Sequence, residues 1–456
     1  MLTRNELKPG QKVQVTIADL THKGQGVTHI EDYPIFIPQS LPGEEIIAEI
    51  THLGQHIGHA RIIDILKESP DRMHAYEEAD YLSSTMPLRH LAYPAQLAFK
   101  REQVRRVFQK NAGLDLTIPA MIGADSVLGY RNKAQIPVQQ VDGQLATGIF
   151  KAGTHQLIPT EDFKIQDPEI DRIIIKVRDI MRHYQISPYD EKPHSGDLRH
   201  IIVRRGHYTG EVMIVLVTRT FTLPHRSEIV CAINEQIPDT VSLIQNINNE
   251  RTNVILGRQA MVLAGQDYYT DQINHHQFKI SHQSFFQVNT VQTEKLYQVA
   301  VDFAELTGRE TVIDAYCGIG TLSIALAEHA KHVYGVEIVP DAIQNAKENA
   351  KINQIDHLTF EAGAAEKWMA EKQAQGLKAD VIVVDPPRKG LDKSFIEAAV
   401  QMGPKKIVYV SCNPATQSRD VQLFMENGYT LRKIQPVDMF PMSHHIESVV
   451  LMTRML

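Results

Sequence analysis

The stretch TVIDAYCGIGTLSIALA, residues 311–327, runs from an apolar strand pattern through a glycine-containing turn into a helical pattern. From about residue 281 onward the chain repeats this alternation. The expected strands are Thr311–Ala315, His332–Glu337, Val381–Asp385 and Lys406–Val410, and an expected helix covers 340–353. Alternating strands and helices favour a doubly wound parallel sheet with right-handed crossovers. We therefore predict an α/β domain over residues 281–456 whose ligand lies at the carboxyl ends of the strands.

The first 70 residues differ from this domain because their strand patterns are short and are separated by glycine and proline turns. Turn signals stand at Pro9-Gly10, Gly24-Gln25-Gly26 and Pro42-Gly43. The short strands are expected at 12–17, near 27, 33–37, 45–52 and 60–66. Such a series predicts an OB-like β-barrel over residues 1–70, which would serve either RNA binding or protein contacts.

Residues 73–280 combine both kinds of pattern and are expected to form a mixed α+β central domain. A helix over residues 94–110 is expected to pack on the C-terminal domain. The segments GYRNKAQIPV (129–138) and LRHIIVRRG (198–206) are strand-like and basic. Phosphate contacts are one interpretation of their cations, although charged runs are more often solvated faces. These cations are Arg131, Lys133, Arg199, Arg204 and Arg205.

The composition is that of an ordinary globular protein, with 43% hydrophobic residues and a net charge of −7. That charge is mild evidence against a nucleic-acid partner, since such proteins usually carry a basic excess. The start MLTRNELKPGQK lacks the apolar core of a signal peptide, and no apolar run is long enough to span a membrane. We therefore expect a cytoplasmic protein without a membrane partner. Three widely spaced cysteines predict neither a disulfide framework nor a metal site.

Two acidic residues follow strands of the predicted C-terminal sheet and mark its ligand site. Gly318 and Gly320 permit a tight turn and close backbone approach, but Ser323 stands where a dinucleotide pattern has its third glycine. Glu337 lies 17 residues after Gly320 and is suited to accept hydrogen bonds from both ribose hydroxyls. Asp385 begins the motif DPPRKGL (385–391), whose prolines stiffen the loop beside the ligand.

The stretch KKIVYVSCNPATQSRDVQLF (405–424) contains the candidate nucleophile, Cys412. Asn413 is expected to cap a helix with Pro414 in its first turn, so the thiol lies at a helix N-terminus that favours the thiolate. A lone cysteine is more often a small core residue, but the position at a strand end favours catalysis. Glu447, in FPMSHHIESVVLM (440–452), is the candidate base on a neighbouring strand, and otherwise a surface carboxylate. We assign no catalytic role to His444 or His445.

Six motifs together carry a resemblance to a known family. SFFQVN (284–289), DAYCGIGTL, GVE, VDPPRKGL, VSCNPAT and SHHIESV resemble the RNA (uracil-5-)methyltransferase family in order and spacing. The likeness to its 23S ribosomal RNA branch extends to the N-terminus, where KGQGV and IFIPQSLPGEEI resemble the RNA-binding TRAM barrel. The resemblance implies a Rossmann-like, S-adenosylmethionine-dependent methyltransferase domain that acts on uridine C5 in RNA. The expected partner is 23S ribosomal RNA before or during ribosome assembly.

The resemblance also implies a role for each motif residue. Cys412 is the nucleophile that adds to uracil C6, which makes C5 nucleophilic, and Glu447 is the base that removes the C5 proton. The expected cofactor residues are Gln287, Tyr316, Gly318, Gly320, Glu337 and Asp385. A uracil within a helix hides C6, so the target must lie in a loop or be flipped out. The candidate substrate contacts are Arg131, Lys133, Phe286 and Arg388, with Phe285 and Phe286 either stacking on bases or packing in the core.

The sequence departs from the family pattern in one respect, the cysteines of an iron–sulfur cluster. Some ribosomal members bind such a cluster through four cysteines, but YLSSTMPLRHL (81–91) and the region of Phe163-Lys164 have none, so no cluster is expected.

Several alternative functions compete with uracil-C5 methylation of 23S ribosomal RNA. Transfer RNA is an alternative substrate. Arg388 disfavours amine methylation, which uses an aromatic residue after the prolines, and cytosine-C5 methylation, which uses a cysteine there. The presence of Cys412 together with its acidic partners argues against a non-catalytic RNA-binding or assembly factor.

Overall fold

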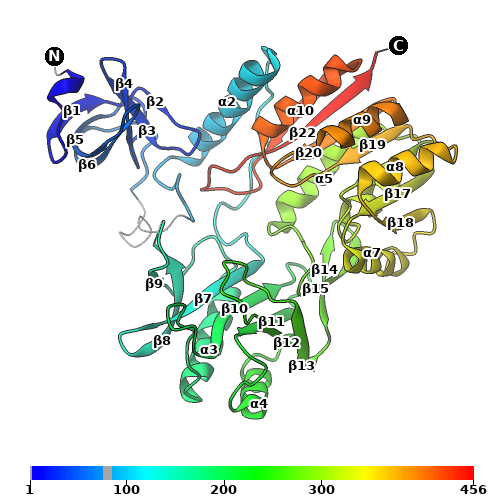
Figure 1. Ribbon diagram of the computed structural model, residues 1–456, viewed down its shortest axis with the longest axis horizontal. Helices are drawn as coiled ribbons and strands as arrows, with labels where there is room; N and C mark the ends of the chain where they lie inside the picture. The colour runs from blue at the N-terminus through cyan, green and yellow to red at the C-terminus, as the bar shows by residue number, and fades with distance from the viewer. Residues whose placement is uncertain (1–2, 75–84, 152, 456) are drawn as a thin grey trace. The chain divides into compact units, whose positions relative to one another are not determined.

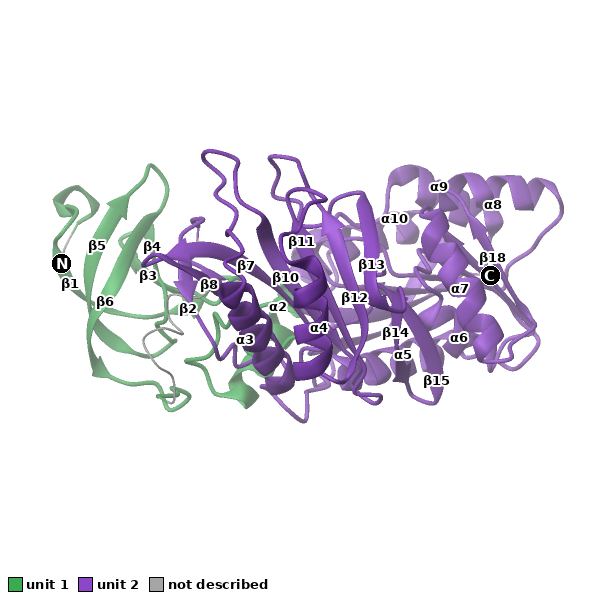
Figure 2. Ribbon diagram, turned by 90° about the horizontal axis from the view of Figure 1, so that it is seen from below, with its two compact units in different colours: residues 1–106, 440–445 green, residues 107–439, 446–456 purple. Residues whose placement is uncertain are grey.

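The computed structural model describes residues 3–74, 85–151 and 153–455. The chain forms two compact units, residues 1–106 with 440–445 and residues 107–439 with 446–456 (Figure 2). Part of the predicted cluster region, residues 81–84, lies outside the described residues. The helix predicted at 94–110 is α2, Tyr93–Ala112, of which the residues up to Arg106 belong to the first unit. The predicted division near residue 281 falls inside the second unit and stays a prediction.

The first unit contains a six-stranded sheet within residues 3–74, in the order β1-β5-β6-β4-β3-β2. Burial alternates along the strands, and Ile35, Ile37, Ile46 and Ile50 form part of a closed apolar core. This agrees with the predicted small β-fold. The strands are β1 (Lys12–Thr16), β2 (Asp19–Leu20), β3 (Gly26–Ile30), β4 (Tyr33–Ile37), β5 (Glu45–Leu53) and β6 (Gly58–Lys67).

The second unit begins with a mixed sheet of seven strands among its described residues, ordered β13-β12-β11-β10-β7-β8-β9. Its core includes Ile170, Ile174, Val177 and Met181 of α3, which recur at helical spacing and face the strands. The hairpin β14–β15 follows, Tyr268–Ile273 and His276–Ser281. The other elements are β7 (Lys133–Val141), β8 (Gln144–Phe150), β9 (Leu157–Pro159), α3 (Pro168–His183), β10 (Leu198–Arg205), β11 (Val212–Thr218), α4 (Arg226–Gln236), β12 (Thr240–Ile247) and β13 (Gln259–Gly265).

The predicted doubly wound sheet is confirmed, with the strand order β18-β17-β16-β19-β20-β22-β21 (Figure 1, yellow to red). The first five strands run parallel, and β22 lies antiparallel to both of its neighbours. The chain direction across the sheet reverses at β16, and ligands of such sheets bind at the carboxyl ends around that point. The strands are β16 (Thr311–Ala315), β17 (His332–Glu337), β18 (Leu358–Ala362), β19 (Val381–Val384), β20 (Lys406–Ser411), β21 (Tyr429–Val437) and β22 (Glu447–Arg454).

Helices cover the buried faces of this sheet, as a parallel sheet requires. All four residues of β19 are buried, which explains their continuous apolar sequence VIVV. The helices are α5 (Thr290–Ala304), α6 (Thr321–Ala327), α7 (Pro340–Ile352), α8 (Ala365–Ala374), α9 (Lys393–Met402) and α10 (Pro414–Glu426). No helix in the described part of the chain has both the length and the apolar character needed to cross a bilayer.

Candidate active site

The candidate nucleophile and base each lie next to the last residue pair of one antiparallel strand pair. Strand β20 ends at Ser411, which pairs with Ser448 of the antiparallel strand β22. In the same register the next residues on the two strands are Cys412 and Glu447. Opposite residues of antiparallel strands have Cβ atoms about 4.5–5.5 Å apart on the same face of the sheet. The strand register therefore brings the two groups together from positions 35 residues apart in the sequence.

A buried glutamine fixes that register from the other face of the sheet. The Gln417 side chain of α10 is fully buried. Its Nε2 donates to the carbonyls of Tyr409 (2.8 Å) and Ser448 (3.1 Å), and its Oε1 accepts from the Ser448 hydroxyl at 2.5 Å. The amide thus joins the end of β20 to the start of β22. Sequence reasoning missed Gln417, because a glutamine in a helical pattern is usually exposed.

The loop DPPRKGL is attached to the beginning of α10. Asn413 caps this helix with Pro414 in its first turn, as predicted. The Asn413 Nδ2 also donates to the Arg388 carbonyl at 3.0 Å. The buried carboxylate of Asp420 accepts from the backbone N–H of Leu391 at 2.8 Å. These bonds hold the loop after β19 against the loop that carries Cys412.

The electrostatic surroundings of Cys412 differ from the prediction. Burial is the largest cause that raises the pKa of the Cys412 thiol to about 11, the carboxyls of Glu447 and Asp385 contribute to this rise, and Arg388 opposes it. The prediction that the site favours the thiolate is therefore wrong for the protein alone. Burial and the two nearby carboxyls decide the direction of the shift, an effect that motif spacing does not reveal.

The carboxyl groups at the site also favour their protonated forms. Burial raises the pKa of Glu447 well above its usual value, with a further rise from Asp385 and a decrease from Arg388. Burial alone raises the pKa of Asp385 to about 7. At neutral pH the protein alone therefore holds Cys412 as the thiol, and the raised pKa of Glu447 favours its protonated form. Arg388 is the cation that stabilises the anionic form of both groups.

We expect the alkylation of Cys412 by iodoacetamide to rise about tenfold per pH unit between pH 7 and 9.5, because the thiolate fraction rises in this way below the pKa. Replacing Arg388 with leucine should lower the rate throughout this range, since it removes the charge that favours the thiolate. Peptide mass spectrometry measures this rate, and the exposed Cys231 in the same digest controls for reagent activity. A Cys412 rate that levels off below pH 9 would contradict the raised pKa.

The glycine loop after β16 has the backbone that its sequence predicts. Gly320 has φ of 85°, and a Cβ there would lie 2.8 Å from the Phe360 ring, so only glycine fits. Gly318 and Tyr316 also have positive φ, 55° and 69°. The backbone N–H of Gly318 donates to Oε2 of Glu337 at 3.3 Å, which ties the end of β17 to the loop after β16. Tyr316 packs on Phe395 with ring centroids 5.5 Å apart; its positive φ is uncommon for a tyrosine.

A buried hydrogen bond explains why the third glycine of a dinucleotide pattern is missing. The hydroxyl of Ser323 donates to Oδ2 of Asp314 at 2.5 Å, and both side chains are buried. Burial raises the pKa of Asp314 to about 7, with Asp385 and Glu337 adding to the effect. The carboxyls at the ends of three strands are thus close enough to influence each other. Sequence reasoning missed Asp314, although the start of DAYCGIGTL pointed to it.

In the SFFQVN loop, Gln287 and Phe286 are buried and Phe285 is exposed. Gln287 is 8% exposed, and its carbonyl accepts from Asn132 Nδ2 at 3.0 Å. Asn289 caps α5 and donates to the Met439 carbonyl at 3.1 Å, which fixes the end of the loop. Phe286 is buried against Phe278, with ring centroids 6.2 Å apart. Of the two alternatives left open, Phe286 packs in the core and is not available as the predicted substrate contact, whereas Phe285, 72% exposed, is the accessible aromatic ring.

Three of the candidate phosphate-binding arginines are engaged within the protein: two donate hydrogen bonds to backbone carbonyls and one forms an ion pair with an aspartate. Arg199 is buried and donates to the carbonyls of Asn248 and Glu250, both at 2.7 Å. Arg204 is buried and donates to the Ser284 carbonyl at 2.8 Å. Arg205 forms an ion pair with Asp167 at 2.7 Å. These contacts contradict the phosphate interpretation for all three.

The other two candidate phosphate-binding cations, Arg131 and Lys133, lie beside the SFFQVN loop. Arg131 Nε donates to the Lys133 carbonyl at 3.1 Å, and between them Asn132 binds the loop. Burial, together with the positive charges of Arg204 and Arg131, lowers the pKa of Lys133 to about 7. No ion pair of Arg131 or Lys133 occurs within residues 3–74, 85–151 and 153–455. An anion bound here would therefore be stabilised.

Comparisons with known proteins identify the chain. Residues 232–455 match the family model described as tRNA (Uracil-5-)-methyltransferase, and residues 6–63 match the TRAM domain. Proteins from Enterococcus faecalis and Lactiplantibacillus plantarum, both named uncharacterized RNA methyltransferase, are 49% and 51% identical to it. Each alignment covers 98% of both chains. The chain belongs to this RNA (uracil-5-)methyltransferase family. The family assignment confirms the predicted TRAM barrel and the predicted methyltransferase domain.

A solved structure supports the same fold for this family member. The Pyrococcus abyssi tRNA (uracil-54, C5)-methyltransferase, in complex with S-adenosyl-L-homocysteine, has a TM-score of 0.76 and 26% identity, covering 96% of this chain and 99% of that one. This RNA methyltransferase is therefore an S-adenosylmethionine-dependent enzyme acting on uracil C5. Its glycine loop suits the cofactor, because Gly320 leaves room for close backbone approach and Glu337 lies directly beside the loop.

Proposed function

We propose that the enzyme methylates C5 of a uridine in 23S ribosomal RNA through a covalent bond between Cys412 and uracil C6. The mechanism is supported by the pairing of Ser411 with Ser448, which is adjacent to Cys412 on one strand and to Glu447 on the other. The ribosomal substrate rests on the likeness of the sequence to that branch. Transfer RNA is the competing substrate, because the related Pyrococcus abyssi enzyme acts on a tRNA uracil. A cytoplasmic location and the lack of an iron–sulfur cluster stay predictions.

In the proposed mechanism Cys412 first loses its proton and its sulfur bonds to C6, while the C5–C6 π electrons move toward O4 as an enolate. S-adenosylmethionine, when bound, supplies an electrophilic methyl group for the carbanion character at C5. Glu447, as a carboxylate, then takes the proton from C5. The C5–C6 double bond re-forms and the sulfur leaves C6. Cys412 is thereby regenerated and one methyl group has replaced one proton.

The charges around the pair suggest how the two protons are removed before reaction. Both pKa values are raised by burial and by carboxyls, and Arg388 is the group that lowers them. A cationic ligand at the strand ends would act in the same direction as Arg388. Ligand binding and deprotonation of Cys412 are therefore coupled in this proposal. The protein alone would keep its nucleophile as an unreactive thiol.

Residues near the SFFQVN loop are proposed to hold the RNA. Arg131 and Lys133 suit phosphate binding, since their charges are partly buried beside that loop. A phosphate would raise the pKa of Lys133 toward its usual value and so keep it charged. Phe285 offers an exposed ring on which an unstacked base can rest. Arg388 is proposed to lie near the target base, because its charge acts on Cys412.

Incubation with RNA containing 5-fluorouridine tests this proposal. Fluorine at C5 cannot leave as a proton, so the enzyme should stay bonded to the RNA after methyl transfer. We expect mass spectrometry of the denatured protein to find the adduct on the Cys412 peptide, with the mass of one added methyl group. Sequencing of the attached RNA from a mixture of 23S ribosomal RNA and tRNA identifies the substrate. Attached tRNA alone would overturn the ribosomal assignment, and no adduct would overturn the mechanism.

A further inference from the structure

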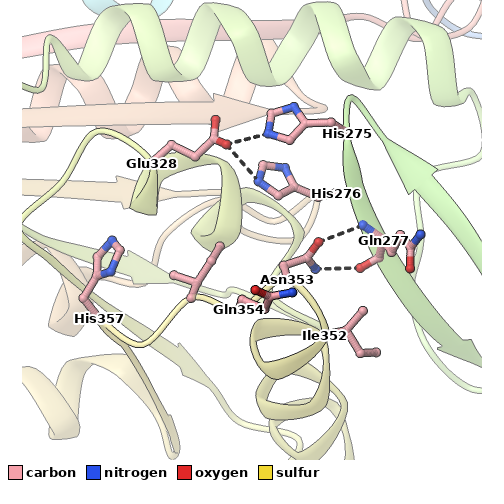
Figure 3. A pocket seen from close by; sticks show the side chains of 9 residues that line it. His275, His276, Gln277, Glu328, Ile352, Asn353, Gln354 and His357 are labelled. Carbon is pink, nitrogen blue, oxygen red and sulfur yellow. Dashed lines mark hydrogen bonds and ion pairs between the residues drawn. The ribbon is translucent and has the colours of Figure 1, made fainter.

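A cluster of metal-binding side chains lies on the second unit at the tip of the β14–β15 hairpin. His275 and His276 stand at that tip, and Glu328 stands at the C-terminal end of α6. Both imidazole Nε2 atoms point at the same oxygen, Glu328 Oε1, at 2.5 Å and 3.2 Å (Figure 3). The two imidazole rings are 4.2 Å apart between centroids. These three residues are named the hairpin cluster here.

We propose that the hairpin cluster binds a divalent transition-metal ion of the zinc class. Two imidazoles and one carboxylate are a ligand set that suits Zn²⁺, Co²⁺ and Ni²⁺, and they leave at least one coordination position for water. The spacing of the cysteines predicts no metal site, but the ligands of this cluster are two histidines and a glutamate. The fold creates it by bringing together residues 53 positions apart.

The distances fit such an ion after a small shift of one side chain. With metal–ligand bonds of about 2.0–2.1 Å in a tetrahedron, ligand atoms lie roughly 3.3 Å apart. His276 Nε2 already lies 3.2 Å from Glu328 Oε1. His275 must move outward by less than 1 Å from its 2.5 Å hydrogen bond, and its side chain is 70% exposed and free to do so. The potential ligand atoms all lie within 4.8 Å of one another.

The surroundings of the cluster leave an open coordination position. The side chain of His276 is buried, being only 8% exposed, whereas that of His275 is exposed. The cluster borders a surface hollow of about 530 Å³, which gives water access to the ion. His357 also lines the hollow (Figure 3), but its Nε2 is already engaged, since it lies 2.7 Å from the Ala327 carbonyl.

The ion would fasten the hairpin to the helix that follows the glycine loop. Next to the tip, Asn353, the residue that follows α7, already binds the Gln277 backbone: its Oδ1 accepts from the Gln277 N–H at 2.9 Å and its Nδ2 donates to the Gln277 carbonyl at 2.7 Å. The hairpin tip itself is held to α6 by Glu328. Because α6 begins directly after Gly320, the ion would restrain the far end of the helix that carries the loop. The proposal concerns stability and is independent of the RNA substrate.

Titration of the full-length, chelator-treated protein with Co²⁺ tests the site through its visible absorption. We expect saturation at one ion per chain. His275→Ala and Glu328→Gln should each weaken binding roughly tenfold or more, because each removes one of three ligands. His329→Ala is the matched control, since it removes an exposed imidazole next to Glu328 that is outside the cluster. Zn²⁺ should displace the Co²⁺ and raise the melting temperature of the wild type by a few degrees, but not that of His275→Ala.

Three results would overturn the proposal. The first is the absence of saturable Co²⁺ binding, which would leave the cluster as a hydrogen-bonded group only. The second is equal weakening by His329→Ala and His275→Ala, which would indicate scattered surface histidines. The third is an intense near-ultraviolet thiolate band, which would assign the ion to a cysteine.

Discussion

Replacing Cys412 with alanine is expected to abolish methyl transfer, with a loss on the order of 10⁴-fold or more. The proposed reaction needs a nucleophile at C6 before C5 can accept a methyl group, and Cys412 is the described cysteine whose pKa is raised by the carboxyl of Glu447. Transfer of labelled methyl from S-adenosylmethionine to RNA measures the loss. The variant should still bind the cofactor, because the glycine loop and Glu337 are unchanged.

Cys231→Ala is the matched control for this experiment. Cys231 is exposed on α4, a helix whose Ile229 and Ile233 pack in the core of the mixed seven-stranded sheet β7–β13 and not in the catalytic sheet. The loss of Cys231 should therefore leave the rate of methyl transfer unchanged. Cofactor binding is measured separately by calorimetry with S-adenosyl-L-homocysteine. A Cys412→Ala protein that binds this ligand and keeps more than a tenth of the wild-type rate would rule out covalent catalysis by Cys412.

The strands of the catalytic sheet could be predicted because their surroundings are simple. Thr311–Ala315 and His332–Glu337 have the bounds that the sequence predicts, since each short strand pattern is followed by a turn or by a polar ligand-binding residue. The position of β22 between β20 and β21, by contrast, could not be predicted from local patterns, because it depends on pairing between distant segments. The sequence predicted that a strand begins at Glu447 but did not predict its register against Cys412.

Side-chain surroundings could be predicted less well than backbone positions. Phe285 and Phe286 are adjacent in a loop, where no periodicity indicates which ring faces the core. Arg199 and Arg204 were interpreted as phosphate ligands, but a guanidinium with five donors is equally suited to bind loop carbonyls. The direction of the pKa shift at Cys412 depends on burial and on Glu447 and Asp385 together. None of these effects is visible before the fold brings the groups together.

Replacing Glu447 with glutamine is expected to trap the covalent intermediate on ordinary uridine RNA. An amide of the same shape cannot take the C5 proton, so the methylated base cannot leave Cys412 by elimination. Adduct formation should survive, because the change removes a carboxyl that raises the pKa of Cys412. Turnover should fall about 10²–10⁴-fold. Denaturing gels and mass spectrometry should then find a methylated RNA–protein species without any fluorinated base.

The control variants for this prediction separate trapping from inactivity. Glu426→Gln makes the same chemical change on the exposed end of α10 and should leave turnover and adduct level as in the wild type. Cys412→Ala combined with Glu447→Gln should form no adduct, because the bond to C6 has no sulfur. An adduct in this double variant would assign the nucleophile to another residue. A Glu447→Gln protein with normal turnover and no trapped RNA would show that a different group removes the C5 proton.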